Sequence, residues 1–386
     1  MSTPTTQRPA EGEKLRITSY IDSDSHVEEP DACWNYLDAE FAHRRPRILN
    51  LRGEPGLPTQ DAYWIIDGRQ HPRPLGESPT YYGSPPVSTM ALRKAYSVPS
   101  QSLEDVAVRL ADMDRNKIKL SVLFPTVFLA HLTDDPRFEA ALMRSYNTWL
   151  AERCGLSGGR LKYVALLPLR SPNDAVAEVR RAKELGAVGL YTMGTAGEMM
   201  LNDRRLDPVW EEAVKQDMPL CIHIGYSHPG ILASCDSVYI GIATAVLLPI
   251  FMAFAAITGG GVLDRHPRLK VGFFEAGGDW LPYMVRRMGH YHPVVKQIFN
   301  LPVPKKTPAE YFMERRIYFS VEGHEPHLAE VIETVGEDCV FASADMPHAE
   351  GRESELEEMV ERTDLPAGLR DKILSANTLR FYGLPA

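Results

Sequence analysis

Five residues of the kinds that bind transition metals stand at the ends of apolar segments. They are Asp24, His26, His223, Glu275 and Asp345. Asp24 and His26 are two residues apart, so on an extended backbone both side chains leave the same face and can approach one ion. Taken singly, each residue is weak evidence, because Asp-x-His occurs by chance and a histidine in an apolar run is usually structural. That all five stand at the ends of apolar segments indicates a metal site, because buried carboxylates and imidazoles need pairing or a cation.

The elements that would position these residues alternate between short β-branched or aromatic segments and amphipathic helical stretches. The expected strands are Ile17–Asp22, Leu120–Phe124, Tyr163–Leu167, Ala187–Tyr191, Leu220–Ile224, Lys270–Phe274, Ile317–Val321 and Val340–Ser343. The expected helices include Leu103–Ile118, Pro136–Cys154, Asn173–Leu185 and Asp207–Gln216. Eight βα units predict a (β/α)8 TIM barrel, in which reactive groups gather at the carboxyl ends of the strands. Strands one, five, six and eight would bring the five residues there.

The chain is expected to form one domain. Residues 1–16 are polar and predict a disordered arm, and residues 17–386 predict a single barrel. The segment from about 41 to 101 is rich in Pro, Gly and aromatic residues and follows the first strand, so we expect a lid-like insertion on the catalytic face. Val238 to Ile257 is uncharged over nearly the length that spans a bilayer, but its place between two strands favours a buried barrel helix.

The amino-acid composition limits the classes of molecule that this protein could bind. The net charge of −9, with no block of Lys or Arg, disfavours nucleic acid. The five cysteines are scattered and include no CxxC pair, which argues against a disulfide framework or a thiolate zinc site. The first residues lack the apolar core of a secretory signal. We therefore expect a cytoplasmic homo-oligomer, such as a homodimer, that acts on a small molecule and not on a membrane.

Four motifs resemble the amidohydrolase superfamily, specifically its amidohydrolase-related, ACMS decarboxylase-like branch. They are IDSDSHVEEP at Ile21–Pro30, CIHIG in the fifth strand, FFEAGGDWLP at Phe273–Pro282 and ASADMPHAEG at Ala342–Gly351. The resemblance covers most of the chain from Ile21 onward. It implies a metal-dependent barrel enzyme, and the branch includes decarboxylases, lactonases and other hydrolases.

The sequence departs from this family at three metal-site positions. The family's first-strand His-x-His is Asp24-x-His26 here, and Glu275 replaces the sixth-strand histidine. Strand four ends in Gly189–Thr192 without a lysine, which excludes a pair of ions bridged by a carbamylated lysine. A carboxylate such as Glu275 could bridge two ions instead. We expect one or two divalent ions, with iron or manganese suited at least as well as zinc.

Two activities follow from the resemblance. The first is a hydrolase in which metal-activated water attacks an ester, thioester, lactone or amide, with Asp345 as base. A coenzyme A thioester hydrolase of a diterpenoid pathway, with a di-iron site, is similar in its carboxylate-rich set. The alternative is a non-oxidative decarboxylase, for which His228 or His324 could replace the missing sixth-strand histidine. A barrel without metal, acting as a scaffold, is a third possibility that the five ligand-type residues oppose.

Substrate features are less defined. Tyr191, Tyr226 and Trp280 stand near strand ends and indicate a pocket for a bulky apolar group, although they could equally pack the insertion. Arg170 follows the third strand and could bind a carboxylate or form an ordinary ion pair. His348, after Asp345, is a further imidazole whose role the spacing leaves open.

Overall fold

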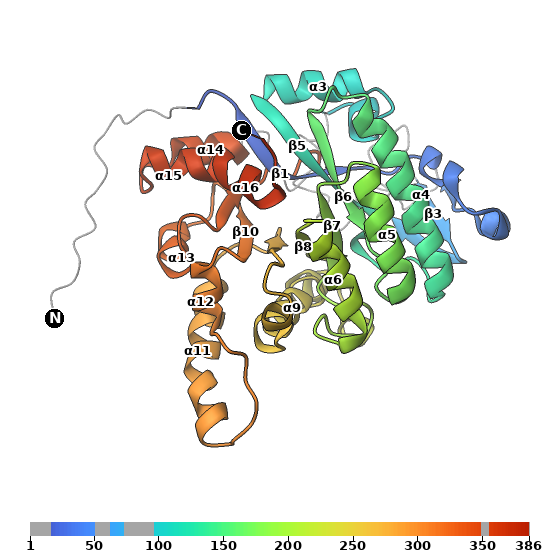
Figure 1. Ribbon diagram of the computed structural model, residues 1–386. Coiled ribbons are helices and arrows are strands. Elements are labelled where there is room, and N and C mark those ends of the chain that lie inside the picture. Colours follow the sequence, from blue (N-terminus) through green and yellow to red (C-terminus); the bar gives the residue numbers. More distant parts are fainter. Residues whose placement is uncertain (1–16, 51–61, 73–95, 349–354, 386) are drawn as a thin grey trace.

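The protein folds as a (β/α)8 barrel (Figure 1). The computed structural model describes residues 17–50, 62–72, 96–348 and 355–385. Eight parallel strands follow one another around the barrel in chain order. They are β1 (Tyr20–Val27), β5 (Ile118–Pro125), β6 (Leu161–Leu166), β7 (Gly189–Met193), β8 (Leu220–His223), β9 (Val271–Phe274), β10 (Ile317–Val321) and β11 (Val340–Ala342). The predicted fold class is therefore confirmed.

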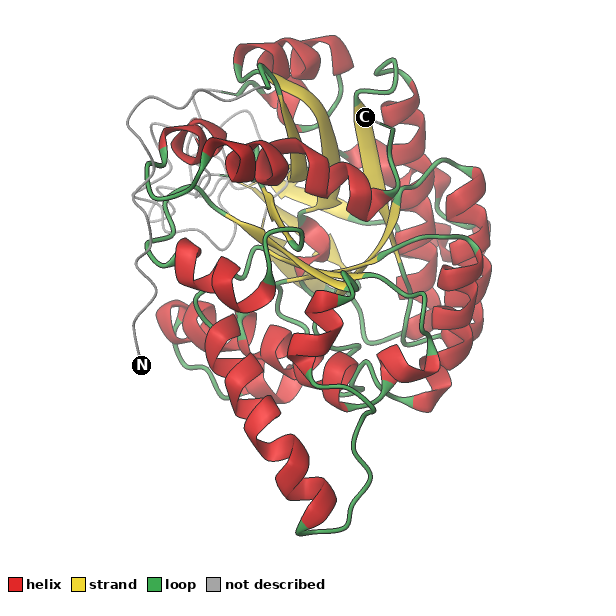
Figure 2. Cartoon of the chain, turned by 60° about the vertical axis from the view of Figure 1, so that its left-hand side comes forward, coloured by secondary structure: helices red, strands yellow, loops and turns green. Residues whose placement is uncertain are grey.

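Helices surround the strands on the outside of the barrel (Figure 2). They are α2 (Val98–Gln101), α3 (Val106–Arg115), α4 (Pro136–Gly155), α5 (Pro172–Glu184), α6 (Asp207–Lys215), α7 (Pro229–Ala233), α8 (Val238–Gly241), α9 (Leu248–Gly259), α10 (Val262–Arg265), α11 (Leu281–Gln297), α12 (Pro308–Met313), α13 (Leu328–Val335), α14 (Glu355–Glu361), α15 (Ala367–Asp371) and α16 (Asn377–Tyr382). Short 3-10 turns are η1 (Asp31–Tyr36), η2 (Ala39–Arg44), η3 (Val127–Leu129) and η4 (Arg204–Leu206), and π-helical turns are η5 (Ile242–Val246) and η6 (Lys372–Ala376).

Local sequence explains where these elements begin and end. At α4, Asp135 accepts hydrogen bonds from the N–H groups of Arg137 and Phe138, and Pro136 occupies the first turn, where no N–H is needed. The first strand was expected at Ile17–Asp22, but it runs over Tyr20–Val27. It extends because His26 still pairs with Phe124 of β5, so Asp24 and His26 lie inside the strand and not after it.

The insertion after β1 is described in part. It forms an antiparallel sheet of β2 (Arg47–Asn50), β3 (Ala62–Ile66) and β4 (Arg69–Pro72). Trp64 of β3 is fully buried against Trp34 of η1, with ring centroids 5.8 Å apart. This packing was not expected. Tyr81 and Tyr82 of the insertion, and the expected arm at residues 1–16, lie outside the described residues, and the lid remains a prediction.

One helical stretch, Tyr239–Gly259, is long and apolar enough to cross a membrane, judged by length and composition alone; the search covered the described residues. Within it, α9 buries Ile250, Phe254 and Ile257 against the barrel. The Phe254 ring lies 5.6 Å from that of Phe273 on β9. The apolar composition of α9 is therefore explained by its packing against the strands of the barrel.

The barrel closes between β11 and β1 without a regular strand ladder among the described residues. Side chains and loop residues join these strands instead. Ser23 Oγ donates to the Ala342 carbonyl at 2.8 Å, and Ala344 N donates to Asp22 Oδ1 at 2.9 Å. Beyond the end of β11, Asp345 N donates to the Asp24 carbonyl and His26 N to the Met346 carbonyl. The seam therefore joins the segments that carry Asp24, His26 and Asp345.

Arg109 of α3 stabilises this seam between β1 and the segment after β11. Its side chain is fully buried, and Nη2 donates to the carbonyls of His26 at 3.1 Å and Met346 at 2.9 Å. Burial lowers the pKa of Arg109 to about 10, against the opposing effect of nearby acidic groups such as Asp22. The guanidinium remains charged at neutral pH and joins β1 to the segment that follows β11.

We predict that Arg109→Met lowers both the free energy of unfolding and the affinity for metal. Loss of two hydrogen bonds from a charged donor should cost about 2–4 kcal/mol, measured by urea unfolding. Arg316→Met is the matched control, because Arg316 is also buried and donates to two carbonyls, those of His266 and Leu269, far from the seam. The control should lose stability and keep its metal affinity. Equal metal affinity in both variants would show that the seam does not depend on Arg109.

Candidate metal centre

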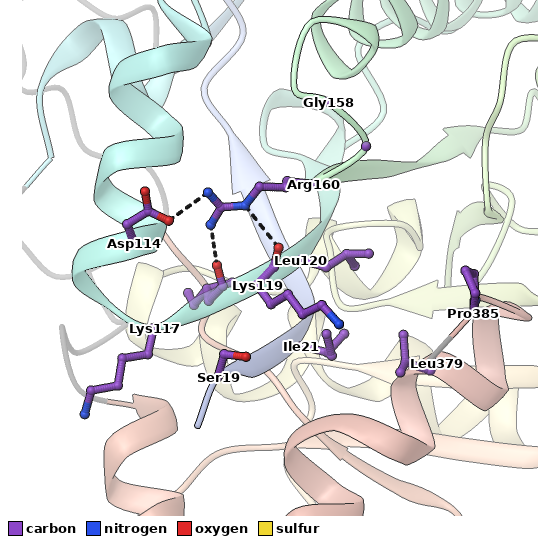
Figure 3. A pocket seen from close by; sticks show the side chains of 12 residues that line it. Ser19, Ile21, Asp114, Lys117, Lys119, Leu120, Gly158, Arg160, Leu379 and Pro385 are labelled. Atoms are coloured by element: carbon purple, nitrogen blue, oxygen red, sulfur yellow. Dashed lines mark hydrogen bonds and ion pairs between the residues drawn. The ribbon is translucent and has the colours of Figure 1, made fainter. Parts of the chain in front are cut away.

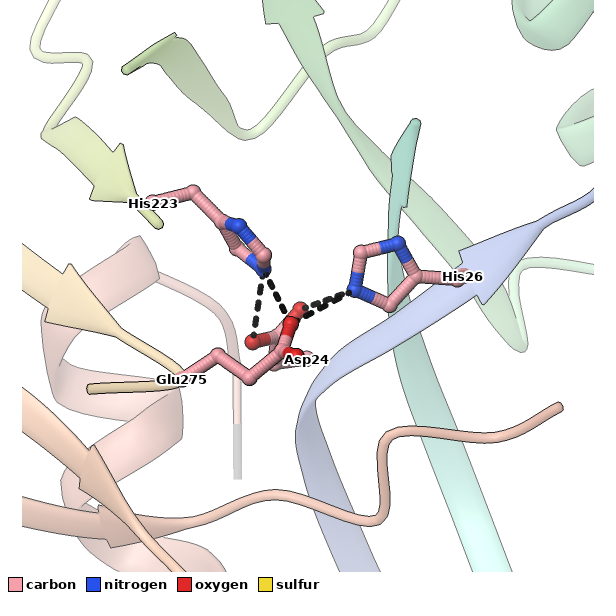
Figure 4. A group of neighbouring side chains, drawn as sticks. All are labelled: Asp24, His26, His223 and Glu275. Atoms are coloured by element: carbon pink, nitrogen blue, oxygen red, sulfur yellow. Dashed lines mark ion pairs between the residues drawn. The ribbon is translucent and has the colours of Figure 1, made fainter. Parts of the chain in front are cut away.

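Four predicted ligands meet at the carboxyl ends of three strands (Figure 4). Asp24 and His26 come from β1, His223 ends β8, and Glu275 follows β9. His223 Nε2 lies 3.0 Å from Glu275 Oε2 and 3.4 Å from Asp24 Oδ2, and His26 Nε2 lies 3.5 Å from Glu275 Oε2. One donor atom from each residue falls within 4.8 Å of the others. This spacing suits ligands around a single ion.

The histidines are oriented as metal ligands are. His26 Nδ1 lies 2.7 Å from the Pro125 carbonyl, and His223 Nδ1 lies 3.0 Å from the Ile224 carbonyl. A carbonyl can only accept, so each Nδ1 carries the proton and each Nε2 presents a lone pair to the cluster. Both Nε2 atoms, both carboxylate oxygens of Asp24 and Glu275 Oε2 are buried without a hydrogen-bond partner. Buried polar atoms in this state fit a divalent cation.

Asp345, the fifth predicted ligand, approaches the same nitrogen of His26 as Asp24 and Glu275 do. Its Oδ1 lies 3.5 Å from His26 Nε2. It belongs to a second group of possible ligands, His26, Glu275, Asp345 and His348, which shares two members with the first. The structure thus brings all five predicted residues together, while their role as ligands remains a prediction.

Two of the carboxylates sit on backbone in the left-handed region. Glu275 has φ 57° and Asp345 has φ 48°. Such a conformation costs a non-glycine residue about 1 kcal/mol or more, and it recurs at functional sites. Glu275 N is held by Ser320 Oγ of β10 at 2.9 Å, and Asp345 N by the Asp24 carbonyl at 3.0 Å. These bonds turn each carboxylate back over the barrel mouth.

The charges of the cluster act strongly on one another. Although burial opposes a charge on His223, the carboxylates of Asp24 and Glu275 raise its pKa to about 10. Burial alone would raise the pKa of Glu275, but His223 and His26 lower it well below its usual range. The carboxylates therefore demand positive charge at this point, which a proton on His223 or a bound cation can supply.

His348 supports Asp345, a role that spacing alone left open. Its Nδ1 lies 2.9 Å from Asp345 Oδ1, and its ring stacks on that of His26 at 3.9 Å. Its Nε2 lies 2.8 Å from Thr126 Oγ1. Thr126 N in turn donates to the buried carboxylate of Glu29, whose pKa burial raises to about 8. Sequence reasoning missed Thr126 and Glu29, because they are 97 positions apart and no periodic pattern links them.

Other candidate residues lie outside the two groups. His228 caps α7, where its Nδ1 accepts from Ile231 N at 3.3 Å, and His324 is partly exposed and 3.3 Å from Glu322 Oε2. Arg170 pairs with the buried Glu139 at 2.7 Å, so it is an ordinary ion pair. The catalytic roles expected for His228 and His324 remain untested predictions.

A hollow of about 540 Å³ opens at the opposite end of the barrel, where β1 and β5 begin (Figure 3). Two of its three cations are engaged with neighbours: Arg160 pairs with Asp114 at 2.7 Å, and Lys117 pairs with Glu357 at 2.7 Å. None of the residues in either ligand group lines it. Both groups of possible ligands therefore lie at the mouth of the barrel and away from this hollow.

Comparison with known proteins agrees with this architecture. A family model described as Amidohydrolase matches residues 66–384. The chain belongs to this family. The fold is also that of an amidohydrolase from Mycobacterium avium subsp. paratuberculosis K-10, with a TM-score of 0.76, 22% identity and coverage of 95% of this chain and 100% of that chain. Because the family model matches most of the chain, this protein is an enzyme of the amidohydrolase superfamily.

Similarity to characterised relatives bears on the reaction. The chain is 30% identical over 256 residues to γ-resorcylate decarboxylase from Rhizobium sp. (strain MTP-10005). The aligned region covers 62% of this chain and 76% of the relative. Its fold also resembles that of a dihydroxybenzoic acid decarboxylase from Polaromonas sp. JS666, whose structure contains manganese and the inhibitor 2-nitroresorcinol. The TM-score is 0.63 at 24% identity, and the match covers 72% of this chain and 86% of that chain.

These relatives correct the expected activity. We expected metal-dependent hydrolysis first and decarboxylation second, but three γ-resorcylate decarboxylases match the chain at 28–30% identity, so the hydrolase expectation was wrong. The comparisons likewise give no support for a coenzyme A thioester hydrolase or a di-iron site. The hydrolase expectation relied on Glu275, which stands where the family has a sixth-strand histidine, as evidence against decarboxylation.

We predict that purified protein contains about one equivalent or more of a divalent transition metal, and that His223→Ala loses most of it. His223 supplies a buried donor atom that water could replace only at a cost in affinity. Elemental analysis by mass spectrometry measures the content. His228→Ala is the matched control and should keep the wild-type content, because His228 lies outside both groups; loss of metal from both variants would refute the assignment.

Proposed function

We propose that this protein is a metal-dependent, non-oxidative decarboxylase of a small aromatic carboxylic acid. The observation that supports the reaction most is the 28–30% identity to γ-resorcylate decarboxylases, which by name act on an aromatic carboxylate. The cluster of Asp24, His26, His223, Glu275 and Asp345 at the barrel mouth supports the metal dependence. A substrate of that class is small enough to reach a site at the end of a barrel.

The ion is a divalent transition metal, with manganese, iron and zinc all compatible with this donor set. Carboxylate oxygens and imidazole nitrogens together suit manganese and iron as well as zinc. Asp24, His26, His223 and Asp345 would hold it, with Glu275 as a fifth ligand or a bridge to a second ion. When bound, the ion supplies Lewis acidity toward the oxygen atoms of the substrate.

The reaction requires one proton and no oxidant. The bond between the ring carbon and the carboxylate breaks, its electron pair stays on the carbon, carbon dioxide leaves, and a proton takes its place. Asp345 is the group best placed to pass on this proton: its carboxylate takes the proton from His348 Nδ1, which lies 2.9 Å from Asp345 Oδ1, and gives it to the ring carbon. His228 and His324 are the alternatives.

Aromatic side chains form the floor beneath the site. The Phe124 ring lies 5.3 Å and the Tyr191 ring 6.0 Å from the ring of His223. Both residues are buried, and the Tyr191 hydroxyl donates to the Phe128 carbonyl at 3.0 Å, so its polar group is satisfied. These rings give the His223 imidazole an apolar surrounding on the barrel side, which keeps water away from that face of the cluster.

We predict that the wild-type protein releases carbon dioxide from 2,6-dihydroxybenzoate or a related hydroxybenzoate, and that Asp345→Asn lowers kcat by about 100-fold or more. An amide cannot deliver the proton. Carbon dioxide release and metal content are measured on the same samples, which separates loss of proton transfer from loss of the ion. Asp364→Asn, at an exposed aspartate paired with Arg362, is the control.

Two results would count against this proposal. A panel of hydroxybenzoates from which the metal-loaded protein releases no carbon dioxide would exclude the substrate class. Near-normal turnover in a metal-loaded Asp345→Asn protein would move the proton donor to His228 or His324.

We predict that Glu275→Gln distinguishes one ion from two. If Glu275 bridges two ions, removal of its negative charge leaves too little charge to hold two cations a few ångströms apart, and the protein should lose at least one of them. If Glu275 is a terminal ligand, the stoichiometry should stay the same and only the affinity should fall. Metal analysis of the variant beside wild type decides between the two, since unchanged stoichiometry ends the bridging hypothesis.

A further inference from the structure

Thr126 follows the last residue of β5, and its hydroxyl bonds to a distant side chain and not to its own helix. It is the N-cap residue of η3, a position where a threonine usually accepts a bond from a backbone N–H of the first turn. Thr126 makes no such bond. The residue is fully buried, and its Oγ1 lies 2.8 Å from His348 Nε2. The hydroxyl therefore serves the ring beside Asp345 and not the helix.

The backbone of Thr126 is held by another residue. Thr126 N donates to Glu29 Oε1 at 2.8 Å, and Val127 N donates to Glu29 Oε2 at 2.9 Å. Glu29 is fully buried, so it pairs with both N–H groups at the start of η3 without solvent. A β-branched side chain on a fixed backbone has few rotamers. The direction of the Thr126 hydroxyl is thus set before it meets His348.

Two consecutive residues at the end of β5 hold two stacked imidazoles. The Pro125 carbonyl lies 2.7 Å from His26 Nδ1, and Thr126 Oγ1 lies 2.8 Å from His348 Nε2. The rings of His26 and His348 stack with centroids 3.9 Å apart and planes 27° apart. One dipeptide therefore fixes the ring that would bind the ion and the ring that contacts Asp345.

The His348 ring is held at both of its nitrogens. Nδ1 lies 2.9 Å from Asp345 Oδ1, and Nε2 is held by Thr126. A ring that is bonded at one nitrogen only can still turn about the bonds of its side chain, whereas bonds at two nitrogens fix its plane. The contact with Thr126 therefore keeps Nδ1 directed at the carboxylate.

The two partners at the end of β5 differ in what they allow. A carbonyl can only accept, so Pro125 keeps the proton of His26 on Nδ1. A hydroxyl can accept from an N–H or donate to a bare ring nitrogen. A histidine that gives the proton on Nδ1 to a carboxylate stays neutral only if Nε2 keeps its own proton, and Thr126 Oγ1 can accept that N–H throughout. The hydroxyl thus suits a ring that exchanges a proton.

We propose that Thr126 is a positioning residue for the reaction. Its hydroxyl holds the His348 ring so that Nδ1 stays directed at Asp345 Oδ1 while a proton passes between them, and Thr126 itself neither gains nor loses a proton. This inference rests on the proposed function, in which His348 and Asp345 deliver the proton to the ring carbon. The alternative is that Thr126 merely satisfies a buried imidazole and contributes to stability alone.

Two substitutions at Thr126 separate these roles. Thr126→Val keeps the shape of the side chain and removes the hydroxyl, so it should lower kcat for carbon dioxide release by about 10-fold or more, as misplacement of a catalytic group does. KM and metal content should stay near wild type, because Thr126 belongs to neither group of possible ligands. Thr126→Ser keeps the hydroxyl and should keep most of the wild-type kcat.

Thr258→Val is the matched control. Thr258 is also buried, and its Oγ1 donates to the Phe254 carbonyl of α9 at 2.6 Å. Thr258→Val and Thr126→Val should both lower the melting temperature, because each removes a buried hydroxyl that has a partner. Only Thr126→Val should lower kcat. A role in stability alone would instead leave kcat per folded, metal-loaded molecule unchanged in both.

A measurement without turnover tests the position of the ring directly. In zinc-loaded protein with ¹⁵N-labelled histidine, the ring signals of His348 are assigned by their loss in His348→Gln. Wild type and Thr126→Ser should give the same nitrogen shifts for His348, and Thr126→Val should change them. Thr258→Val should leave them as they are.

Three outcomes would overturn the proposal: wild-type kcat in Thr126→Val, a loss in Thr126→Ser as large as that in Thr126→Val, or His348 signals that Thr126→Val does not change. Failure of the proposed function has a different signature. Wild-type protein that releases no carbon dioxide would reject the reaction, and with it the role of Thr126 in that reaction, while the nitrogen shifts would still show whether Thr126 holds the ring.

Discussion

Mutual repulsion among three carboxylates is the constraint on which the rest of this structure depends. Asp24, Glu275 and Asp345 are held within a few ångströms of two imidazoles, in a place where solvent is too scarce to screen their charge. Such an arrangement is stable only when positive charge lies among them. Although burial opposes it, the carboxylates raise the pKa of His223 to about 10, so a proton there or a bound cation can supply this positive charge.

The scaffold keeps this unfavourable arrangement from relaxing. Backbone carbonyls fix the rings of His26 and His223, and left-handed backbone turns Glu275 and Asp345 inward. His26 and His223 lie in paired strands, and Glu275 N donates to Ser320 Oγ. Asp345 N donates to the Asp24 carbonyl across the seam, so moving any of these residues would break a strand pair or a hydrogen bond. The barrel thus supplies rigidity, and the strand ends supply the chemistry.

Sequence alone was sufficient for the features that repeat or cluster. The eight strands follow from alternation of β and α patterns, and the five ligand candidates follow from polar residues at strand ends. The small β2–β3–β4 sheet was not predicted, because its pairing depends on a tryptophan contact across distant segments. Glu29, Thr126 and Arg109 act through backbone groups far away in sequence, and no local pattern marks such contacts. The reaction could not be deduced either, since hydrolysis and decarboxylation use the same donor atoms.

The irregular seam between β11 and β1 affects the order in which the molecule can be completed. Asp24 and His26 leave the ribosome early, whereas Asp345 is made more than three hundred residues later. Until the last strand arrives, the first strand has only one neighbour, and its two ligands have no fixed partners across the mouth. The full donor set is therefore completed late in biogenesis, and an ion held by all of its members would mark a chain whose first and last strands have already met.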